Sequence, residues 1–190
     1  MGGYPRLVVH RPDIAWLIRH YGLTMLPVES IYLARTYTSP ARSADGSAAG
    51  SAIIGLLSDQ PQSRSLLHRV ACDEMWHAYG GDPFRLLLLH PDGSSEDVVM
   101  GSDIVAGQRV QLLVPAGTWQ AAELVDGGQW ALFGCTVAPE FTSAAFEGGH
   151  ASELVAAYPH RRDDIERLAV PAHLPTELPV AAPPEVPPAP

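Results

Sequence analysis

Residues 68–82 read HRVACDEMWHAYGGD and place several ionisable side chains within an otherwise apolar part of the chain. Such side chains cost free energy inside an apolar core unless they are paired or used in chemistry. If two alternating strands flank a turn, Glu74 and Trp76 share one face and His77 points the other way. We therefore predict that His68 and Glu74 face inward as a pair, and that His77 faces outward or toward a subunit interface.

Short apolar stretches punctuated by Gly, Pro, Asp and Ser surround this segment. SIYLARTYTS (30–39) is rich in β-branched and aromatic residues, and FRLLLLHPDG (84–93) ends in residues typical of a tight turn. Many short strands with turn signals at this spacing indicate an antiparallel sandwich or barrel. The sequence therefore predicts an all-β fold in which residues near 90–96 form a hairpin.

Two short helices are expected beside these strands. Ile14, Leu17, Ile18 and Tyr21 recur at helical spacing, and a second helical pattern begins near Asp163, after a proline has ended the preceding run. We predict an N-terminal arm over residues 1–11, one domain over 12–170 and a proline-rich disordered tail over 171–190.

Composition limits the classes of partner. The chain has 12 Lys plus Arg against 21 Asp plus Glu, and its formal charge of −9 repels nucleic acid and anionic membranes. Cys72 and Cys135 show no disulfide framework, so reduced thiols are expected. The first residues lack a secretory leader pattern and no apolar run is long enough for a membrane span, so we expect a cytoplasmic protein.

The polar stretches resemble the two cupin motifs. The first motif carries two histidines, a glutamate and a glycine, and these positions hold His68, Val70, Glu74 and Gly81 here. VPAGTWQ (114–120) resembles the second motif, which ends in a histidine; Gln120 occupies that last position here. More closely, residues 67–89, 114–122 and 134–141 resemble the cupin-5 family, a domain of unknown function, and the resemblance covers roughly residues 14–168.

The resemblance implies a double-stranded β-helix, the cupin jelly-roll barrel, with short flanking helices and assembly as a homodimer. Two departures bear on cofactors, because Val70 and Gln120 stand where the motif has metal-binding histidines. A metal would be left with His68, Glu74 and Gln120, a set poor in imidazole. We therefore expect no metal cofactor; the alternative is a divalent transition metal held by those three residues.

Several side chains are candidates for binding a substrate. An amide can donate and accept a hydrogen bond at once, and tryptophans beside a polar cluster are typical of pocket walls, although core packing is their commoner role. An arginine suits an acidic substrate group, and a glutamate on the loop entering the first strand could reach the pocket mouth. The candidates are Gln120, Trp76, Trp119, Glu29, Arg35 and His77.

The leading interpretation is an enzyme that acts on a small, oxygenated metabolite as an isomerase, epimerase or cyclase, with a role in biosynthesis. In it His68, aligned by Glu74, moves a proton next to a carbonyl whose oxygen Gln120 binds. His77 is a second choice of base. The alternatives are a metal-dependent cupin oxygenase or decarboxylase, and a non-catalytic module that binds a small molecule.

Overall fold

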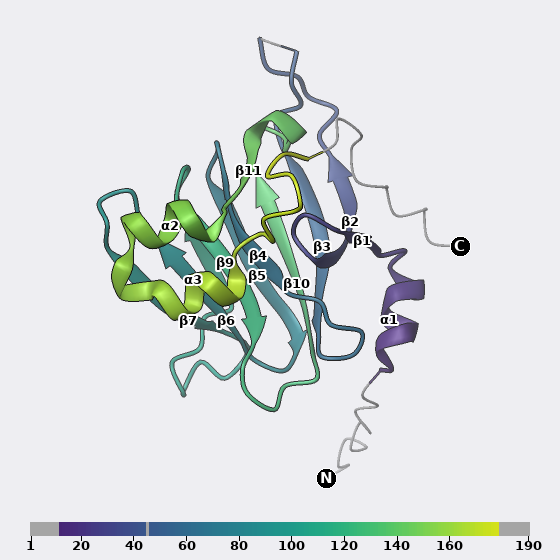
Figure 1. Ribbon diagram of the computed structural model, residues 1–190. Coiled ribbons are helices and arrows are strands. Elements are labelled where there is room, and N and C mark those ends of the chain that lie inside the picture. Colours follow the sequence, from purple (N-terminus) through teal and green to yellow (C-terminus); the bar gives the residue numbers. More distant parts are fainter. Residues whose placement is uncertain (1–11, 45, 179–190) are drawn as a thin grey trace.

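Two antiparallel sheets face each other in the computed structural model, which describes residues 12–44 and 46–178 (Figure 1). The six-stranded sheet contains, in spatial order, β1 (Thr24–Leu26), β2 (Ile31–Thr38), β3 (Ser51–Ser58), β10 (Trp130–Val137), β5 (Glu74–Gly81) and β8 (Gln111–Val114). The five-stranded sheet contains β11 (Phe146–Gly148), β4 (Ser65–Val70), β9 (Trp119–Leu124), β6 (Phe84–Leu89) and β7 (Ser95–Met100). The predicted all-β jelly-roll fold is confirmed.

The expected hairpin joins β6 to β7. The two strands pair antiparallel from Phe84 opposite Met100 to Leu89 opposite Ser95. The His90 N–H donates to the Ser94 carbonyl at 2.9 Å across the turn. Gly93 has a φ of 87°, a left-handed conformation that glycine adopts without steric cost. The turn chemistry read from the sequence therefore matches the observed reversal.

The N-terminal helix α1 (Ile14–His20) covers part of the outer face of the six-stranded sheet (Figure 1). The Asp13 side chain accepts a hydrogen bond from the Ala15 N–H at 3.2 Å and so caps the helix. Leu17 is buried in a cluster that includes Leu56 and Trp130. The helical stripe predicted for this segment is thus confirmed as a packing surface on the barrel.

Two further helices, α2 (Ala151–Ala157) and α3 (Arg162–Leu168), lie against the outer face of the five-stranded sheet (Figure 1). Leu154 and Ile165 are buried there with Leu87 of β6. The helix expected near Asp163 is confirmed, whereas α2 was not predicted as a separate helix. The described residues also contain the 3₁₀ turns η1 (Ser143–Ala145) and η2 (Pro159–Arg161).

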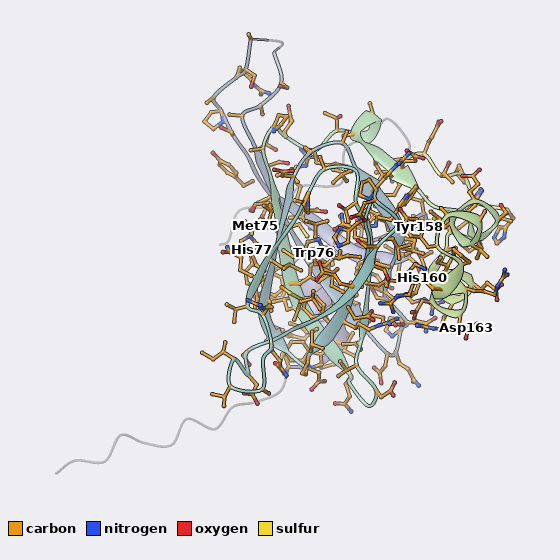
Figure 2. All side chains as sticks on the ribbon, turned by 90° about the vertical axis from the view of Figure 1, so that its left-hand side faces the viewer. Met75, Trp76, His77, Tyr158, His160 and Asp163 are labelled. Atoms are coloured by element: carbon orange, nitrogen blue, oxygen red, sulfur yellow. The ribbon has the colours of Figure 1, made fainter. Side chains whose placement is uncertain are left out.

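The space between the sheets is filled with apolar side chains at one end and holds a pocket at the other. Trp76, Phe84 and Phe133 pack together in the filled part. Figure 2 shows Trp76 pointing between the sheets, while Met75 and His77 lie on the outer side of the same strand. This alternation places Glu74, two residues before Trp76, on the inner face as predicted.

Contacts with the barrel continue beyond residue 170. Leu174 and Leu178 pack against a buried cluster that contains Phe146, and the Gly148 N–H donates to the Thr176 carbonyl at 2.7 Å. The predicted arm over residues 1–11 and the end of the predicted tail, 179–190, lie outside the described residues. None of the helices in the described ranges has the length and apolar character needed to cross a membrane.

Candidate active site

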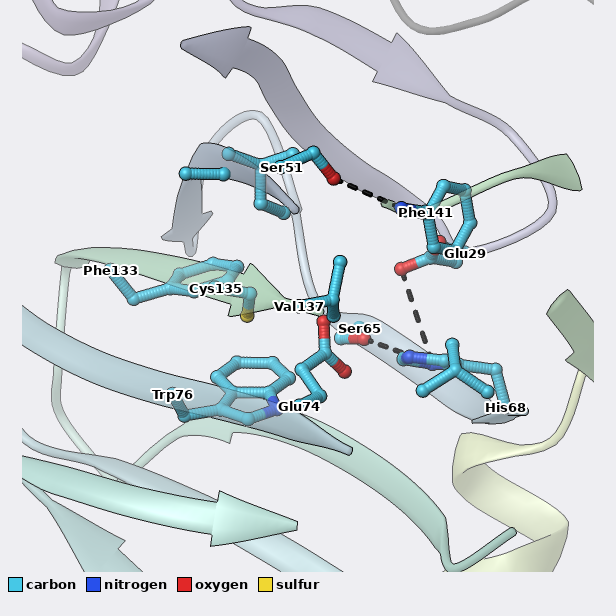
Figure 3. Close-up of a pocket in the computed structure, with 13 residues that line it drawn as sticks. Glu29, Ser51, Ser65, His68, Glu74, Trp76, Phe133, Cys135, Val137 and Phe141 are labelled. Atoms are coloured by element: carbon cyan, nitrogen blue, oxygen red, sulfur yellow. Dashed lines mark hydrogen bonds and ion pairs between the residues drawn. The ribbon is translucent and has the colours of Figure 1, made fainter. Parts of the chain in front are cut away.

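A pocket opens between the two sheets beside β3, β4, β5 and β10 (Figure 3). The volume that the centre of a water-sized molecule can occupy is about 50 Å³. The total empty space, including the open mouth, is about 550 Å³. Its polar lining residues are Glu29, Ser51, Ser65, His68, Glu74 and Cys135, and its apolar ones are Ala52, Ile53, Val70, Trp76, Phe133, Val137 and Phe141. An apolar pocket with a few converging polar groups is typical of a small-molecule site.

Glu29 enters the pocket from the turn between β1 and β2. The Ser30 N–H donates to the Pro27 carbonyl at 3.1 Å, and Ser30 has a φ of 56°, so the chain reverses tightly there. The Leu66 N–H donates to the Glu29 carbonyl at 2.9 Å and ties this turn to β4. Burial raises the pKa of the Glu29 carboxyl to about 8, because desolvation disfavours the charged form. At neutral pH this carboxyl is therefore mostly protonated.

The imidazole ring of His68 is oriented by a backbone carbonyl of its own strand, β4. Its Nδ1 atom lies 2.9 Å from the Leu66 carbonyl oxygen, which can only accept, so Nδ1 carries the proton. The same Nδ1 atom lies 4.0 Å from Glu29 Oε2 (Figure 3). Burial lowers the pKa of His68, although the nearby Glu74 and the Leu66 carbonyl oppose this shift. The ring is therefore neutral at pH 7, with its lone pair on Nε2.

Gln120 connects the two motif residues. It lies directly opposite His68 in the register of β4 and β9, and its Nε2 atom is 3.2 Å from His68 Nε2 and 2.5 Å from Glu74 Oε2. The Trp76 indole N–H donates to Gln120 Oε1 at 2.8 Å. Because that oxygen must accept the indole hydrogen, the amide nitrogen faces the histidine and the glutamate. The expected pair of His68 and Glu74 is thus joined through an amide.

Glu74 is buried and is surrounded by hydrogen-bond donors. Gln120 donates to its carboxyl, and the Cys135 thiol forms a further side-chain hydrogen bond with it. Desolvation raises the pKa of Glu74, while His68 and these two donors act in the opposite direction. Burial and Glu74 also raise the pKa of the Cys135 thiol well above its ordinary value. Cys135 is therefore a protonated donor, and neither Cys135 nor Cys72 forms a disulfide.

The three residues at the cupin ligand positions do not suit a transition metal. A metal ion between His68 and Glu74 would meet the hydrogens of the Gln120 amide nitrogen, which has no lone pair to offer. Turning the amide over would direct its NH₂ group at the Trp76 N–H. Within residues 12–44 and 46–178, no group of three or more His, Cys, Asp or Glu side chains is arranged to hold a metal.

Of the other predicted binding residues, Glu29 and Trp76 line the pocket, whereas Trp119, His77 and Arg35 do not. Trp119 lies on the outer face of its strand, packed with Leu154 beneath the helices, and the Arg69 guanidinium sits 4.6 Å from its ring centroid. His77 faces outward, as predicted, and its Nε2 atom lies 3.1 Å from Thr136 Oγ1.

Arg35 is buried on the face of β2 that Ile31 and Leu33 share, and it is not among the residues that line the pocket. Its Nη2 donates to the Phe141 carbonyl at 3.0 Å, and its Nη1 lies 3.6 Å from Glu140 Oε2. Its Nε has no hydrogen-bond partner in the described part of the chain. The guanidinium therefore supports the backbone of Phe141, whose side chain forms part of the pocket wall.

Sequence reasoning did not select several lining residues. Ser65 lies three residues before His68, and its Oγ is 3.4 Å from the imidazole Nδ1, which is a local spacing that could have indicated a partner. Ser51 and Phe141 come together because the Phe141 N–H donates to Ser51 Oγ at 3.0 Å across 90 residues of sequence. A contact at that separation depends on the barrel topology, so it carries no local sequence signal.

Comparisons with known proteins agree with this architecture. Residues 15–148 match the model of the family described as Cupin_5, cupin superfamily (DUF985). A solved structure of a protein from Shewanella oneidensis is similar, with 28% identity and a TM-score of 0.78 over 85% of this chain and 99% of that one. A hypothetical protein from Leishmania major shares 24% identity, with a TM-score of 0.75 over 84% of this chain and 100% of that one. No curated protein matches the chain.

Proposed function

Because the chain belongs to the Cupin_5 (DUF985) family of the cupin superfamily, we propose that it is an acid–base enzyme that uses its barrel pocket to move a proton on a small, oxygenated metabolite. The reaction class is that of an isomerase, epimerase or cyclase. The observation that supports this proposal is the buried pair of Glu29 and His68, whose facing atoms lie 4.0 Å apart in the pocket. Groups with shifted pKa values in a cleft are typical of catalytic sites.

Glu29 is the proton donor and acceptor in this proposal. Its pKa of about 8 leaves both the acid and the carboxylate form populated near neutral pH, which suits general acid–base catalysis. Among the described residues, its nearest polar side-chain contact is His68 Nδ1 at 4.0 Å, beyond hydrogen-bond distance, so the carboxyl remains available to a substrate. A substrate carbonyl or hydroxyl beside Glu29 could receive its proton and return one in the next step.

His68 is a positioning residue here. Its Nδ1–H donates to the Leu66 carbonyl, and Nδ1 lies 4.0 Å from Glu29 Oε2, so the N–H dipole is close enough to stabilise the carboxylate that forms when Glu29 releases its proton. Its Nε2 accepts from Gln120 and is not directed at a ligand. This assignment moves the main proton-transfer role from the residue that the motif suggested to one that lies outside the motif.

The aromatic and aliphatic walls limit the contact of the reacting atoms with bulk water. Trp76, Phe133 and Phe141 surround the pocket, and Trp76 stacks on Phe133 with ring centroids 4.8 Å apart. A dry site strengthens the effect of each polar group on a developing charge. Gln120 serves this arrangement by fixing the orientation of His68 and Glu74, since both of its N–H groups and its oxygen already have partners.

The proposal is tested by hydrogen exchange in D₂O. Hydroxyacetone and acetoin, two small hydroxyketones, would be incubated with the full chain, and deuterium uptake at the carbons next to the carbonyl followed by NMR. We expect uptake above the background rate for a compound that fits the pocket. Glu29→Gln should reduce the uptake by about 10²- to 10⁴-fold.

The exposed Glu177 supplies a matched control, and Glu177→Gln should leave the uptake unchanged. Equal uptake with and without the protein, across the hydroxyketones tested, would contradict an acid–base function. Binding without uptake would favour a non-catalytic module that holds a small molecule. Uptake that survives in Glu29→Gln but not in His68→Ala would return the proton-transfer role to the histidine.

A further inference from the structure

The pocket lining contains two carboxyls and no permanent cation. Among the lining residues in the described part of the chain, Glu29 and Glu74 are acidic and none is arginine or lysine. The whole sequence contains no lysine, so arginine is the only side chain that could supply a permanent positive charge. An anion that entered this pocket would therefore meet two carboxyls without a positive partner.

His68 does not supply the missing charge. Its single ring hydrogen, on Nδ1, is directed to the Leu66 carbonyl, and Nε2 accepts from the Gln120 amide. Protonating Nε2 would place two N–H groups face to face, at a separation of 3.2 Å between the nitrogens. The hydrogen-bond geometry thus keeps the imidazole neutral, in agreement with the lowering of its pKa by burial.

Within the described part of the chain, Arg35 is hydrogen-bonded to a lining residue, and a carboxylate lies beside it. Its Nη1 lies 3.6 Å from the Glu140 carboxylate, and its Nη2 donates to the Phe141 carbonyl at 3.0 Å. Arg35 is not a lining residue, and an anion in the pocket would have to compete with Glu140 and the Phe141 carbonyl for its guanidinium.

Neutral oxygen atoms, in contrast, find donors in the lining. Ser51 Oγ accepts the Phe141 N–H, so the Ser51 hydroxyl hydrogen can be donated to a ligand. The Glu29 carboxyl is mostly protonated at neutral pH and can donate as well. A carbonyl or hydroxyl oxygen can accept from these groups without bringing an unpaired charge into an apolar site, whereas a buried ion without a partner is strongly disfavoured.

From this lining we infer that the ligand of the pocket is a small uncharged hydroxy- or oxo-compound, and that the pocket excludes carboxylates and phosphates. The inference deepens the proposed function, because it assigns a substrate class to the same pocket. It also concerns binding alone, so it can be tested separately from any reaction.

Matched neutral and anionic compounds provide the test. Hydroxyacetone and glycolate differ by a methyl group in place of a carboxylate oxygen, and acetoin and lactate form a second such pair. Dissociation constants at pH 7 would be measured by ligand-observed NMR with the full chain. We expect each neutral compound to bind at least about tenfold more tightly than its anionic partner, because the anion finds no cation in the pocket.

Variants locate the binding. Ile53 lines the pocket and is partly exposed, so Ile53→Phe should fill space near the mouth and weaken binding of the neutral compounds. Equal or tighter binding of glycolate or lactate overturns the inference, and loss of that anion binding in Arg35→Met would identify Arg35 as the cation responsible. Failure of both neutral compounds to bind also overturns it, as does binding that Ile53→Phe leaves unchanged.

The outcomes separate the two proposals. Neutral compounds that bind but take up no deuterium would contradict the proposed acid–base function and leave the ligand class in place. Deuterium uptake by lactate at the carbon bearing its hydroxyl would support acid–base chemistry and overturn the uncharged class.

Discussion

Gln120 of β9 and His68 of β4 lie directly opposite each other, and their Nε2 atoms are 3.2 Å apart. The amide is oriented by the Trp76 indole, so its nitrogen faces the imidazole and the Glu74 carboxyl together. A residue at a motif position commonly occupied by a metal-binding histidine therefore forms a closed hydrogen-bond network across the two sheets. This network leaves Glu29 as the pocket carboxyl that is available to a ligand.

Removing the Gln120 amide should destabilise the fold. Gln120→Leu leaves His68, Glu74 and the Trp76 N–H without their buried partner, and each unsatisfied buried group costs about 1–3 kcal/mol. We expect the free energy of unfolding in urea to fall by roughly 2–6 kcal/mol in total from His68 and Trp76, since Glu74 can be protonated. Gln62→Leu at an exposed position is the control. A loss below about 1 kcal/mol would contradict the role of Gln120.

Metal content should respond to substitutions at the two departing motif positions. The protein purified without chelator is expected to hold far less than one transition-metal ion per chain, because the Gln120 amide directs hydrogens at the site. The double variant with Val70→His and Gln120→His supplies imidazole nitrogens instead and should bind Zn²⁺ or Ni²⁺ near stoichiometrically by elemental analysis. Stoichiometric metal in the unaltered protein would refute this interpretation.

Stability should fall as the pH rises from 6.5 to 8. The pKa of Glu29 is about 8 in the folded protein and near 4.5 when exposed, so the folded state binds more protons than the unfolded state between these values. The slope is at most about 1.4 kcal/mol per pH unit from this one group. Below pH 6.5, His68 acts in the opposite sense, because burial lowers its pKa and the unfolded chain takes up a proton there.

The comparison of variants isolates the Glu29 contribution. Glu29→Gln should flatten the decline measured by urea unfolding between pH 6.5 and 8, although Glu74, whose pKa is also raised, still adds to it. Glu177→Gln should reproduce the unaltered curve. If the free energy of unfolding of the unaltered protein and of Glu29→Gln changed with pH in parallel, Glu29 would have the same pKa in the folded and unfolded states. That result would contradict the prediction.

Trp119 should matter for stability and not for the pocket. It is 7% exposed and packs beneath α2 and α3 with Leu154 and Tyr158. Trp119→Ala should lower the free energy of unfolding by about 3–5 kcal/mol and leave any ligand affinity unchanged. Trp76→Phe, by contrast, removes the donor to Gln120 and alters the pocket wall. If a folded Trp119→Ala variant bound a ligand more weakly, Trp119 would have to be counted among the binding residues.

The fold was largely predictable because its signals are local. Alternation placed Glu74 and Trp76 inward, the turn residues at 91–93 set a hairpin, and helical spacing identified α1. Helix α2 was not predicted, because Pro159 and the short run before it gave a weak pattern. The expected homodimer and the cytoplasmic location stay predictions.

The site was harder to predict because its decisive contacts are long-range. Glu29 meets His68 only after the turn before β2 is tied to β4 by the Leu66 backbone, and no spacing in the sequence encodes that approach. The motif indicated His68, Glu74 and Gln120, but the orientation of the amide depends on Trp76 of the opposite sheet. Trp119 was assigned to the pocket from its proximity to Gln120, although adjacent strand residues point to opposite faces.

The most direct test is an NMR titration of the Glu29 carboxyl. The side-chain carboxyl carbons of glutamate would be labelled with ¹³C, and the resonance that is missing in Glu29→Gln would be assigned to Glu29. A midpoint near pH 8 is the result expected for a buried acid poised for proton transfer beside His68. A midpoint near the ordinary glutamate value of 4.5 would show a permanently ionised carboxylate and would contradict the proposed role of Glu29.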